Sequence, residues 1–263
     1  MEIEWRKLRA EQLRDCSARG AMVILPLGSI EQHGPHLPVE VDSMLGEQVA
    51  LRTARRMTDA GNPALVLPML WTGVSEHHMS FGGTITLDLP TYAAVVEGIL
   101  RSVLRHGFRR VVLLNGHGGN ENGLRCITDE LTPKLGVPIV QFTYWHAAAE
   151  AIAAILETQK GLRHACEAET SMMMATEPGL IDRAALQGAR GPDQDRPELE
   201  ALVGPGVFRW QALNARSRCG VIGEAPAATA DKGERLLEAQ SARVAEVLGN
   251  KALWSVRASD RWE

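Results

Sequence analysis

Six of the eight histidines in this 263-residue sequence lie in short segments that directly follow runs of apolar residues. Taken singly, a loop histidine is more often a solvated surface residue than a ligand. Six of them in equivalent positions indicate a shared site, because imidazole is the commonest metal ligand and a frequent general acid or base. The six are His33, His36, His77, His78, His117 and His146.

Acidic residues accompany these histidines. Glu31 and His33 are two residues apart, so in an extended loop their side chains point the same way and can reach one metal ion or two adjacent ions. Asp42 follows them and has two oxygens that could bridge a pair of ions. Mixed imidazole and carboxylate donors suit Zn²⁺, Mn²⁺ or Fe²⁺ rather than Ca²⁺, which prefers oxygen ligands alone. The sequence therefore predicts a transition-metal site.

The glycine-rich segment 115–120 has a rival interpretation as a phosphate-binding loop, because it lies between an apolar run and a helical segment. It lacks the G-x-G-x-x-G order, however, and His117 occupies its centre. The chain also contains no Walker-type Gly-Lys-Ser/Thr sequence. We therefore prefer the metal site and keep nucleotide binding as a minor alternative.

The elements that must position these residues alternate along the chain. Apolar runs without polar alternation predict buried strands at residues 21–27, 64–70, 110–114 and 137–143. Helical patterns are present at residues 43–58, with Ser43 as the N-cap, and at 91–106, 122–135, 147–159, 167–175 and 231–248. This alternation predicts an α/β fold with a mainly parallel sheet. The carboxyl ends of such strands share one edge, where ligands bind, and the six histidines project from it.

Composition excludes several classes of protein. With 28 Lys+Arg, 32 Asp+Glu, a net charge of −4 and a pI of about 6.1, the chain has no basic excess for nucleic acid or a membrane surface. Its apolar runs are too short to span a bilayer, and residues 1–20 do not resemble a signal peptide. The four cysteines form no CxxC pair. We expect a single cytoplasmic domain over residues 1–263. Segment 187–206 predicts a long surface loop, either a lid or oligomer contact or a disordered excursion.

Four motifs follow one another in order: residues 28–38 with Asp42, residues 73–77 with 81–84, residues 115–120, and residues 164–171. Together they resemble the creatininase (creatinine amidohydrolase) family. The resemblance implies a three-layer α/β/α fold, a homo-oligomer that is often a hexamer, and two divalent ions per chain, Zn²⁺, Mn²⁺ or Fe²⁺. It also implies hydrolysis of a C–N amide bond in a small cyclic or formylated substrate, by a metal-activated water.

The resemblance assigns metal ligands to five positions. Glu31, His33, Asp42 and His117 match the ligands of the family, with Asp42 as the bridge, and Glu169 matches the last ligand of many members. Creatininases proper use instead a glutamate two residues after the third-strand histidine, where this chain has Gly119. No substrate-stacking tryptophan is evident near His164 either. The sequence therefore does not predict creatinine as the substrate.

Catalytic and substrate-contacting residues are assigned from the same motifs. We expect His164 to donate a proton to the leaving nitrogen, with Glu167 as its orienting partner or the alternative acid. The plain alternative for Glu167 is an exposed carboxylate at a helix N-terminus. Cys166, where the family usually has glycine, is a metal ligand, a redox-sensitive thiol or simply a small buried residue. The expected substrate contacts are Ser75, His77, His36 and Gly118.

The leading hypothesis is a metal-dependent amidohydrolase that acts on a small-molecule amide. One alternative is a peptidase of the same family that trims a short modified peptide in cofactor maturation. Another is a non-catalytic metal- or nucleotide-binding protein on the same scaffold. Retention of all five predicted ligands favours a hydrolase, and the absence of a G-x-S-x-G elbow disfavours a serine nucleophile.

Overall fold

The computed structural model describes residues 1–192 and 209–255 of the chain. Its centre is a parallel sheet with the strand order β2-β1-β3-β4. Met22 pairs with Ala64 on one side and with Arg110 on the other, and Val111 pairs with Ile139. The sequence analysis correctly predicted this parallel sheet. The strands are β1 Met22–Leu27, β2 Ala64–Val66, β3 Arg110–Asn115 and β4 Ile139–Thr143.

Helices occupy much of the remaining described chain. The α-helices are α1 Ala10–Ala18, α2 Val41–Asp59, α3 Leu89–Arg105, α4 Glu121–Leu135, α5 Tyr144–Ala147, α6 Ala149–Ile155, α7 Glu167–Thr176, α8 Arg183–Leu186 and α10 Ala230–Leu248. The short 3-10 helices are η1 Trp5–Lys7, η2 Glu76–Phe81, η3 Gly118–Asn120, η4 Pro178–Leu180, η5 Leu213–Ala215, η6 Ala225–Ala227 and η7 Lys251–Trp254.

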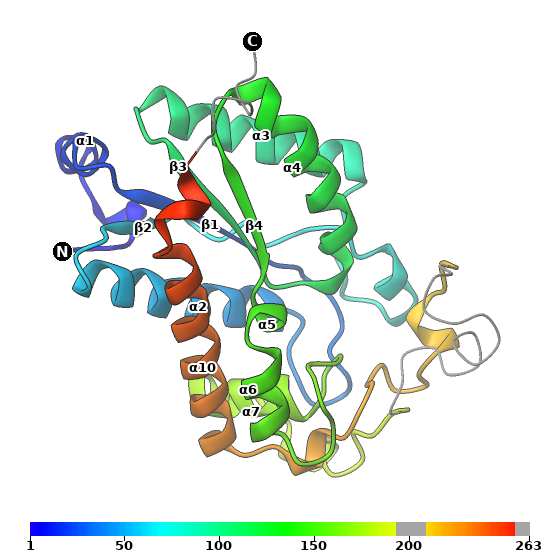
Figure 1. Ribbon diagram of the computed structural model, residues 1–263. Helices are drawn as coiled ribbons and strands as arrows, with labels where there is room; N and C mark the ends of the chain where they lie inside the picture. The colour runs from blue at the N-terminus through cyan, green and yellow to red at the C-terminus, as the bar shows by residue number, and fades with distance from the viewer. Residues whose placement is uncertain (193–208, 256–263) are drawn as a thin grey trace.

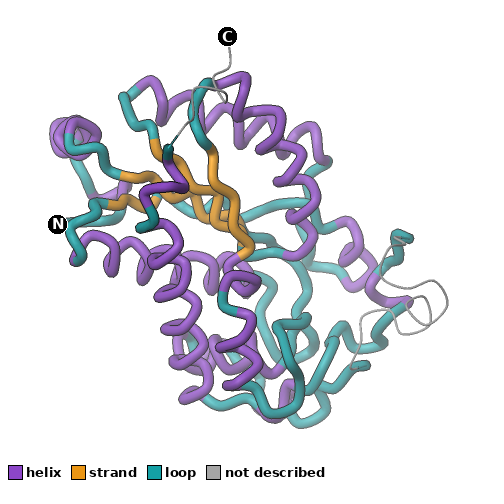
Figure 2. The backbone as a smooth tube through the Cα atoms, in the orientation of Figure 1, coloured by secondary structure: helices purple, strands orange, loops and turns teal. Residues whose placement is uncertain are grey.

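Helices cover both faces of the sheet and so form three layers (Figures 1 and 2). On one face α3 and α4 pack against Val23 and Val111. On the other face α2, α7 and α10 pack against Ile24 and Val112. Successive strand residues point to opposite faces, which is why a strand covered on both sides consists of apolar residues without polar alternation. The predicted α/β/α architecture is confirmed.

Several element boundaries differ from the predictions. The predicted helix 147–159 is two helices, α5 and α6, and it ends at Ile155. The predicted strand 64–70 ends at Val66, although Leu70 still forms an isolated bridge with Leu27. Helix α2 begins before Ser43, whose hydroxyl donates to the carbonyl of Ser29 instead of capping the helix. Helix α1 has no counterpart among the predicted helices.

Two further expectations from the sequence concern the loop 187–206 and membrane-spanning segments. The predicted loop 187–206 falls for the most part outside the described residues. None of the described helices combines the length and the apolar character that crossing a bilayer requires.

Candidate metal centre

The carboxyl edge of the sheet gathers the five predicted ligands from distant parts of the chain. Glu31 and His33 lie on the loop after β1, and His117 follows β3 directly. Asp42 lies in the first turn of α2, and Glu169 lies in the first turn of α7. Each of the five is at most 5% exposed. The fold therefore brings together all the residues to which the motifs assigned a metal.

Two groups of three donors share Asp42. In the first, His117 Nδ1 lies 2.9 Å from Asp42 Oδ2 and 3.2 Å from Glu31 Oε2. In the second, His33 Nε2 lies 3.2 Å from Asp42 Oδ1 and 3.9 Å from Glu169 Oε2. The donor atoms of each group all lie within 4.8 Å of one another. Because each oxygen of Asp42 faces a different group, its carboxylate could act as a ligand in both groups.

Some buried polar atoms of this cluster have no hydrogen-bond partner within it, and a bound cation would satisfy them. Within residues 1–192 and 209–255, His33 Nε2 and Asp42 Oδ2 have no hydrogen bond of acceptable angle, despite the short distances between donor atoms. Buried polar atoms are normally hydrogen-bonded, so such exceptions call for an ion or another partner. The three carboxylates in the cluster also need nearby positive charge, because burying a charge without compensation is costly. The residues present therefore fit a pair of divalent ions.

Proton binding to the cluster reflects the same excess of negative charge. Burial opposes the charged form of His33, but the carboxylates of Asp42 and Glu169 outweigh burial and raise its pKa to about 9. Burial also opposes the charged form of His117, yet Glu31 and Asp42 raise its pKa well above the usual value. Burial raises the pKa of Glu169. Divalent ions would replace protons at these imidazoles, so metal binding should weaken as the pH falls.

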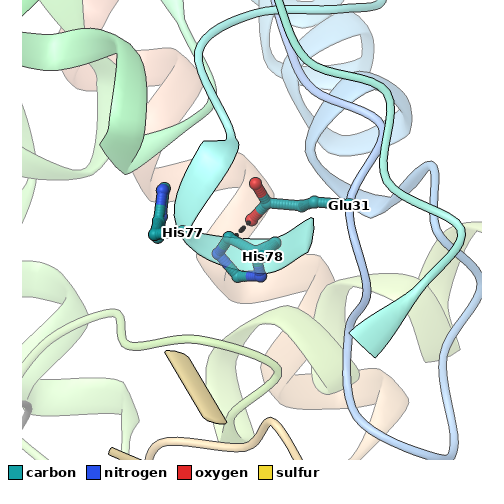
Figure 3. A group of neighbouring side chains, drawn as sticks. All are labelled: Glu31, His77 and His78. Carbon is teal, nitrogen blue, oxygen red and sulfur yellow. Dashed lines mark ion pairs between the residues drawn. The ribbon is translucent and has the colours of Figure 1, made fainter. Parts of the chain in front are cut away.

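Glu31 also faces a pair of adjacent histidines. Figure 3 shows its carboxylate directed toward η2, the short helix that carries His77 and His78. His78 Nε2 lies 3.3 Å from Glu31 Oε1, and the His78 side chain is buried. Glu31, His77 and His78 form a further group of candidate donors. The sequence analysis placed His78 among the six histidines of the sheet edge but assigned a substrate contact to His77 alone, whereas both side chains line the cavity.

Ser75 lies behind a ligand rather than against the substrate space. Its side chain is fully buried, and its Oγ lies 3.0 Å from His117 Nε2 and 2.5 Å from Ser29 Oγ. His117 Nε2 is also 3.1 Å from the carbonyl oxygen of Val74, an acceptor that holds the proton on Nε2 and leaves Nδ1 for a metal. Among the described residues Ser75 does not line the cavity over the cluster. The substrate contact of Ser75 stays a prediction, and the contact that the structure gives its hydroxyl is with His117.

His164 lies beside the predicted metal ligands. Its Nδ1 is 3.6 Å from Glu31 Oε1, and its ring packs against that of His33 with centroids 4.4 Å apart. Its Nε2 lies 2.9 Å from the carbonyl oxygen of Gln32. Burial, together with the neighbouring His33, holds the pKa of His164 well below its usual value, so the imidazole is neutral. Gln32, which the sequence analysis missed, also places its amide nitrogen 3.1 Å from this ring and 3.1 Å from the Gly220 carbonyl.

The structure does not bring Glu167 to His164. Glu167 is fully buried, and its Oε1 accepts a hydrogen bond of 2.6 Å from Lys232 Nζ. The plain alternative of an exposed carboxylate is therefore wrong. The hydrogen bonds given for Glu167 in the described chain go to Lys232, Glu157 and Thr158 and not to His164, so its role as the partner of His164 has no support in this geometry. Cys166 beside it is also buried, its Sγ accepts a hydrogen bond from the Arg163 amide, and burial raises its pKa to about 11. This environment is that of a small buried residue.

Two histidines of the original six, His36 and His146, are not among the candidate donor groups of the described residues. His36 is buried, and its Nε2 lies 2.8 Å from Thr170 Oγ1, while burial lowers its pKa to about 4. Within the described chain it is not among the residues that line the cavity, so its contact with substrate stays a prediction without support from the geometry. His146 is exposed and pairs with Glu121 at 2.8 Å. Both side chains belong to the same sheet edge but not to its site.

A cavity of about 400 Å³ opens over the metal cluster. His77 and Gly118, both expected to contact substrate, line this cavity. Trp145 and Trp210 line it as well, together with His164. The sequence shows no tryptophan near His164, and the fold brings these two indoles to the cavity from segments on either side of it in the chain. Further lining residues are Leu162, Arg163, Leu213, Arg216 and Ile222.

The protein has a three-layer α/β/α fold with two carboxylate–imidazole groups at the carboxyl edge of its sheet, below a cavity. These features define its class: an α/β protein with a candidate metal centre for two ions. The comparisons identify the family within that class. The chain belongs to the creatininase family, because the family model described as creatininase, creatinine amidohydrolase, matches residues 6–248. The family resemblance seen in the motifs is confirmed, and the chain is a member of a hydrolase family.

Individual relatives and solved structures agree with this membership. A creatinine amidohydrolase from Pseudomonas putida is 30% identical over 254 residues, 90% of each chain. A mycofactocin precursor peptide peptidase from Mycobacterium ulcerans is 31% identical over 220 residues, covering 81% of this chain and 79% of that one. A creatininase crystal structure superposes with a TM-score of 0.78 at 28% identity, covering 97% of this chain and 99% of that one.

Two further solved structures carry metals in their descriptions. One is a manganese creatininase, with a TM-score of 0.77 and 27% identity over 94% of this chain and 98% of that one. The other is a mutant creatininase of the Zn-Zn type, with a TM-score of 0.75 and 27% identity over 94% of this chain and 97% of that one. Metal binding is thus a property of neighbouring structures, and the candidate donor groups of this chain agree with it.

Proposed function

We propose that this protein is a metal-dependent amidohydrolase that cleaves a C–N amide bond in a small substrate and uses two divalent ions, Zn²⁺ or Mn²⁺. The observation that carries the proposal is the pair of donor groups that share Asp42 on the floor of the cavity. The first ion would be held by Glu31, Asp42 and His117, and the second by His33, Asp42 and Glu169. Such a pair supplies Lewis-acid activation of water and of an amide carbonyl.

His164 is the residue best placed to move a proton. We take the tautomer in which His164 Nε2–H donates to the carbonyl of Gln32 and Nδ1 carries the lone pair. The side-chain amide of Gln32, 3.1 Å from the same Nε2, then donates to the Gly220 carbonyl instead. Nδ1 is on the side of Glu31, and the imidazole is neutral because burial and His33 lower its pKa. A neutral imidazole accepts a proton at Nδ1 and returns it to the leaving nitrogen. The sequence-based role of proton donor is kept in this form.

The cavity wall supports a small, partly apolar substrate. Trp145 and Trp210 offer flat apolar surfaces, and a cavity of about 400 Å³ is in the range of small-molecule sites. Gly118 lies at the cavity with open space where a side chain would be, so its backbone amide can approach the substrate carbonyl. His77 also lines the cavity and stays an expected substrate contact.

Gly119 argues against the creatinine-specific pattern. A Cβ atom at this position would come within 3.0 Å of His117 Nε2 and of the Val74 carbonyl oxygen. A glutamate could not occupy the position without a rearrangement of the backbone around a metal ligand. Glu169 is the carboxylate that remains for the second ion. We therefore place the substrate outside creatinine itself.

A peptidase is the second candidate function. The chain is as similar to a mycofactocin precursor peptide peptidase as it is to a creatinine amidohydrolase. A short peptide presents the same scissile amide and would use the same donor groups, so only the cavity wall would distinguish the two substrates. The homo-oligomeric, hexameric state and the cytoplasmic location stay predictions.

Two measurements test the proposal. Metal analysis of protein purified without chelator should find close to two transition ions per chain, and fewer than one ion would contradict the dinuclear site. The metal-loaded enzyme is then screened against lactams, hydantoins, formamides and short peptides, with His117→Ala as the control. Hydrolysis of a class of amide by the wild type but not by the variant supports the proposal. Equal rates for both proteins would exclude it.

A further inference from the structure

Glu167 has more polar contacts than a helix-terminal carboxylate requires. It is the first residue of α7 and is fully buried. Its Oε2 accepts hydrogen bonds from the Thr158 amide at 2.9 Å and from the Thr158 hydroxyl at 2.6 Å. Its Oε1 accepts from the Glu157 amide at 3.1 Å and from Lys232 Nζ at 2.6 Å. One carboxylate thus joins the chain after α6, the start of α7 and the first turn of α10.

The segment held in this way is a wall of the cavity. We call residues 156–166 the wall loop, since Leu162, Arg163 and His164 within it line the cavity. At its other end the Ala165 amide donates to the carboxylate of Glu169. Two carboxylates of the first turn of α7 therefore hold the two ends of one loop. Glu169 belongs to the metal cluster, whereas Glu167 is held by a lysine outside it.

We infer that Lys232 is a positioning residue for the active site, which through Glu167 and Thr158 holds the wall loop so that His164 faces the metal ligands. The inference rests on the proposed function, because it takes the cavity as the substrate site. Lys232 itself is distant from the metal cluster in sequence and comes from a different helix. It is 5% exposed, and its ammonium also donates to the carbonyl of Ala227 at 2.8 Å.

Packing of the two helices does not explain the ion pair. Helix α10 packs along α7 (Figure 1), and the two backbones are close at Gly233, where a Cβ would collide with the carbonyl oxygen of Ser171. Leu236 and Leu237 bury the apolar side of α10. A buried ion pair is weak evidence for stability, because desolvation offsets the attraction. The consequence of the pair is local: Lys232 holds the Glu167 carboxylate where it accepts hydrogen bonds from the amides of Glu157 and Thr158, just after the end of α6.

Charge on both partners is maintained by the contact. Burial opposes ionisation of Glu167, but Lys232 and Thr158 outweigh burial and lower the pKa of this carboxyl. Burial likewise opposes the charged form of Lys232, and Glu167 and Glu157 raise its pKa. Removal of the Lys232 ammonium leaves the Glu167 carboxylate buried without a counter-ion, which weakens the attachment of the wall loop. Lys232 also faces Glu157 within the wall loop, at 3.1 Å, so both of its carboxylate partners join it to that segment.

Hydrogen exchange of the metal-loaded full chain tests the inference without a known substrate. We compare Lys232→Met and Thr158→Val with the wild type, and with Arg235→Gln as a matched control. Arg235 lies on the same helix in an exposed pair with Asp231. Lys232→Met should speed exchange at residues 157–163 by about tenfold or more, with normal metal content. Thr158→Val, which keeps the ion pair, should produce a smaller increase in the same peptide, and Lys232→Arg should restore slow exchange.

Activity provides the second readout. On any amide that the wild type hydrolyses, Lys232→Met should lower kcat/KM by roughly 10- to 100-fold, since misplacement by about 1 Å has effects of this size. Unchanged exchange at residues 157–163, or faster exchange spread evenly over α7 and α10, would overturn the inference. A wild type that hydrolyses none of the amides would refute the proposed function, while the exchange data would still decide the role of Lys232. If Lys232→Met does not fold, Lys232→Gln, which keeps a hydrogen-bond donor but removes the charge, takes its place in both measurements with the same expected and contradicting results.

Discussion

Replacement of Gly119 by alanine should disturb the metal centre, although it adds a single methyl group. Three atoms lie within 3.0 Å of the position that the new Cβ would take: His117 Nε2, the Val74 carbonyl oxygen and His77 Cε1. Ordinary contacts begin at 3.4 Å, so the imidazole and the carbonyl would have to move by about 1 Å. Overpacking of this kind costs about 1–3 kcal/mol.

The displaced imidazole is the one that faces Asp42 and Glu31 through Nδ1, at 2.9 and 3.2 Å. We therefore expect Gly119→Ala to lower the affinity for the first ion by about 10- to 100-fold, as loss of ligand support does elsewhere. The thermal midpoint should fall by roughly 2–4 °C per kcal/mol. Metal analysis after dialysis and calorimetry measure the two effects. Gly118→Ala is the matched control, because nothing lies within 4 Å of its Cβ position. Normal metal content and an unchanged midpoint in Gly119→Ala would refute the reasoning.

Three further predictions concern the same site. Ser75→Ala removes the hydroxyl 3.0 Å from His117 Nε2 and should weaken zinc binding about 10- to 100-fold in a chelator competition; unchanged affinity would contradict its supporting role. Asp42→Asn should lose both ions and Glu169→Gln only one, so identical metal contents in the two variants would exclude the shared carboxylate. The pKa of His36 is about 4 in the folded protein, below its usual 6.5. As the pH falls from about 6.5 to 4, the imidazole therefore binds a proton in the unfolded chain but stays neutral in the folded one. Stability should fall over that window by up to about 1.4 kcal/mol per pH unit, and urea titrations should show a shallower decline in His36→Asn; equal declines would contradict it.

Local patterns in the sequence were enough to predict the layers of the fold. The strands consist of apolar residues because both faces are covered, and that property belongs to each strand separately. The end of α6 illustrates what local patterns cannot show. The helical pattern extends to Gln159, but the amides of Glu157 and Thr158 donate to Glu167 instead of continuing the helix. An acceptor ten residues ahead, fixed by a lysine on another helix, leaves no local signal.

The site was predictable to the extent that its chemistry follows from residue types beside strand ends. Glu31, His33, Asp42 and His117 carry such a signal, and the resemblance to the family added Glu169 to these predicted metal ligands. Trp145 and Trp210 do not, because their common cavity exists only after β4 and a distant segment have come together. Ser75 differs again. Its motif predicted a substrate contact, and only the fold shows that its hydroxyl lies 3.0 Å from His117 Nε2, the ring nitrogen opposite the one that faces Asp42.

The fates of Glu167 and Glu169 follow from helical geometry. Residues two apart on an α-helix are rotated by about 200° and do not face each other. Once residues 167–175 are predicted to be helical, the two carboxylates cannot both turn toward one metal cluster. Assignment of Glu169 to the metal therefore requires Glu167 to point into a different environment. A carboxylate buried there needs a cation and hydrogen-bond donors, and Lys232 with Thr158 provides them.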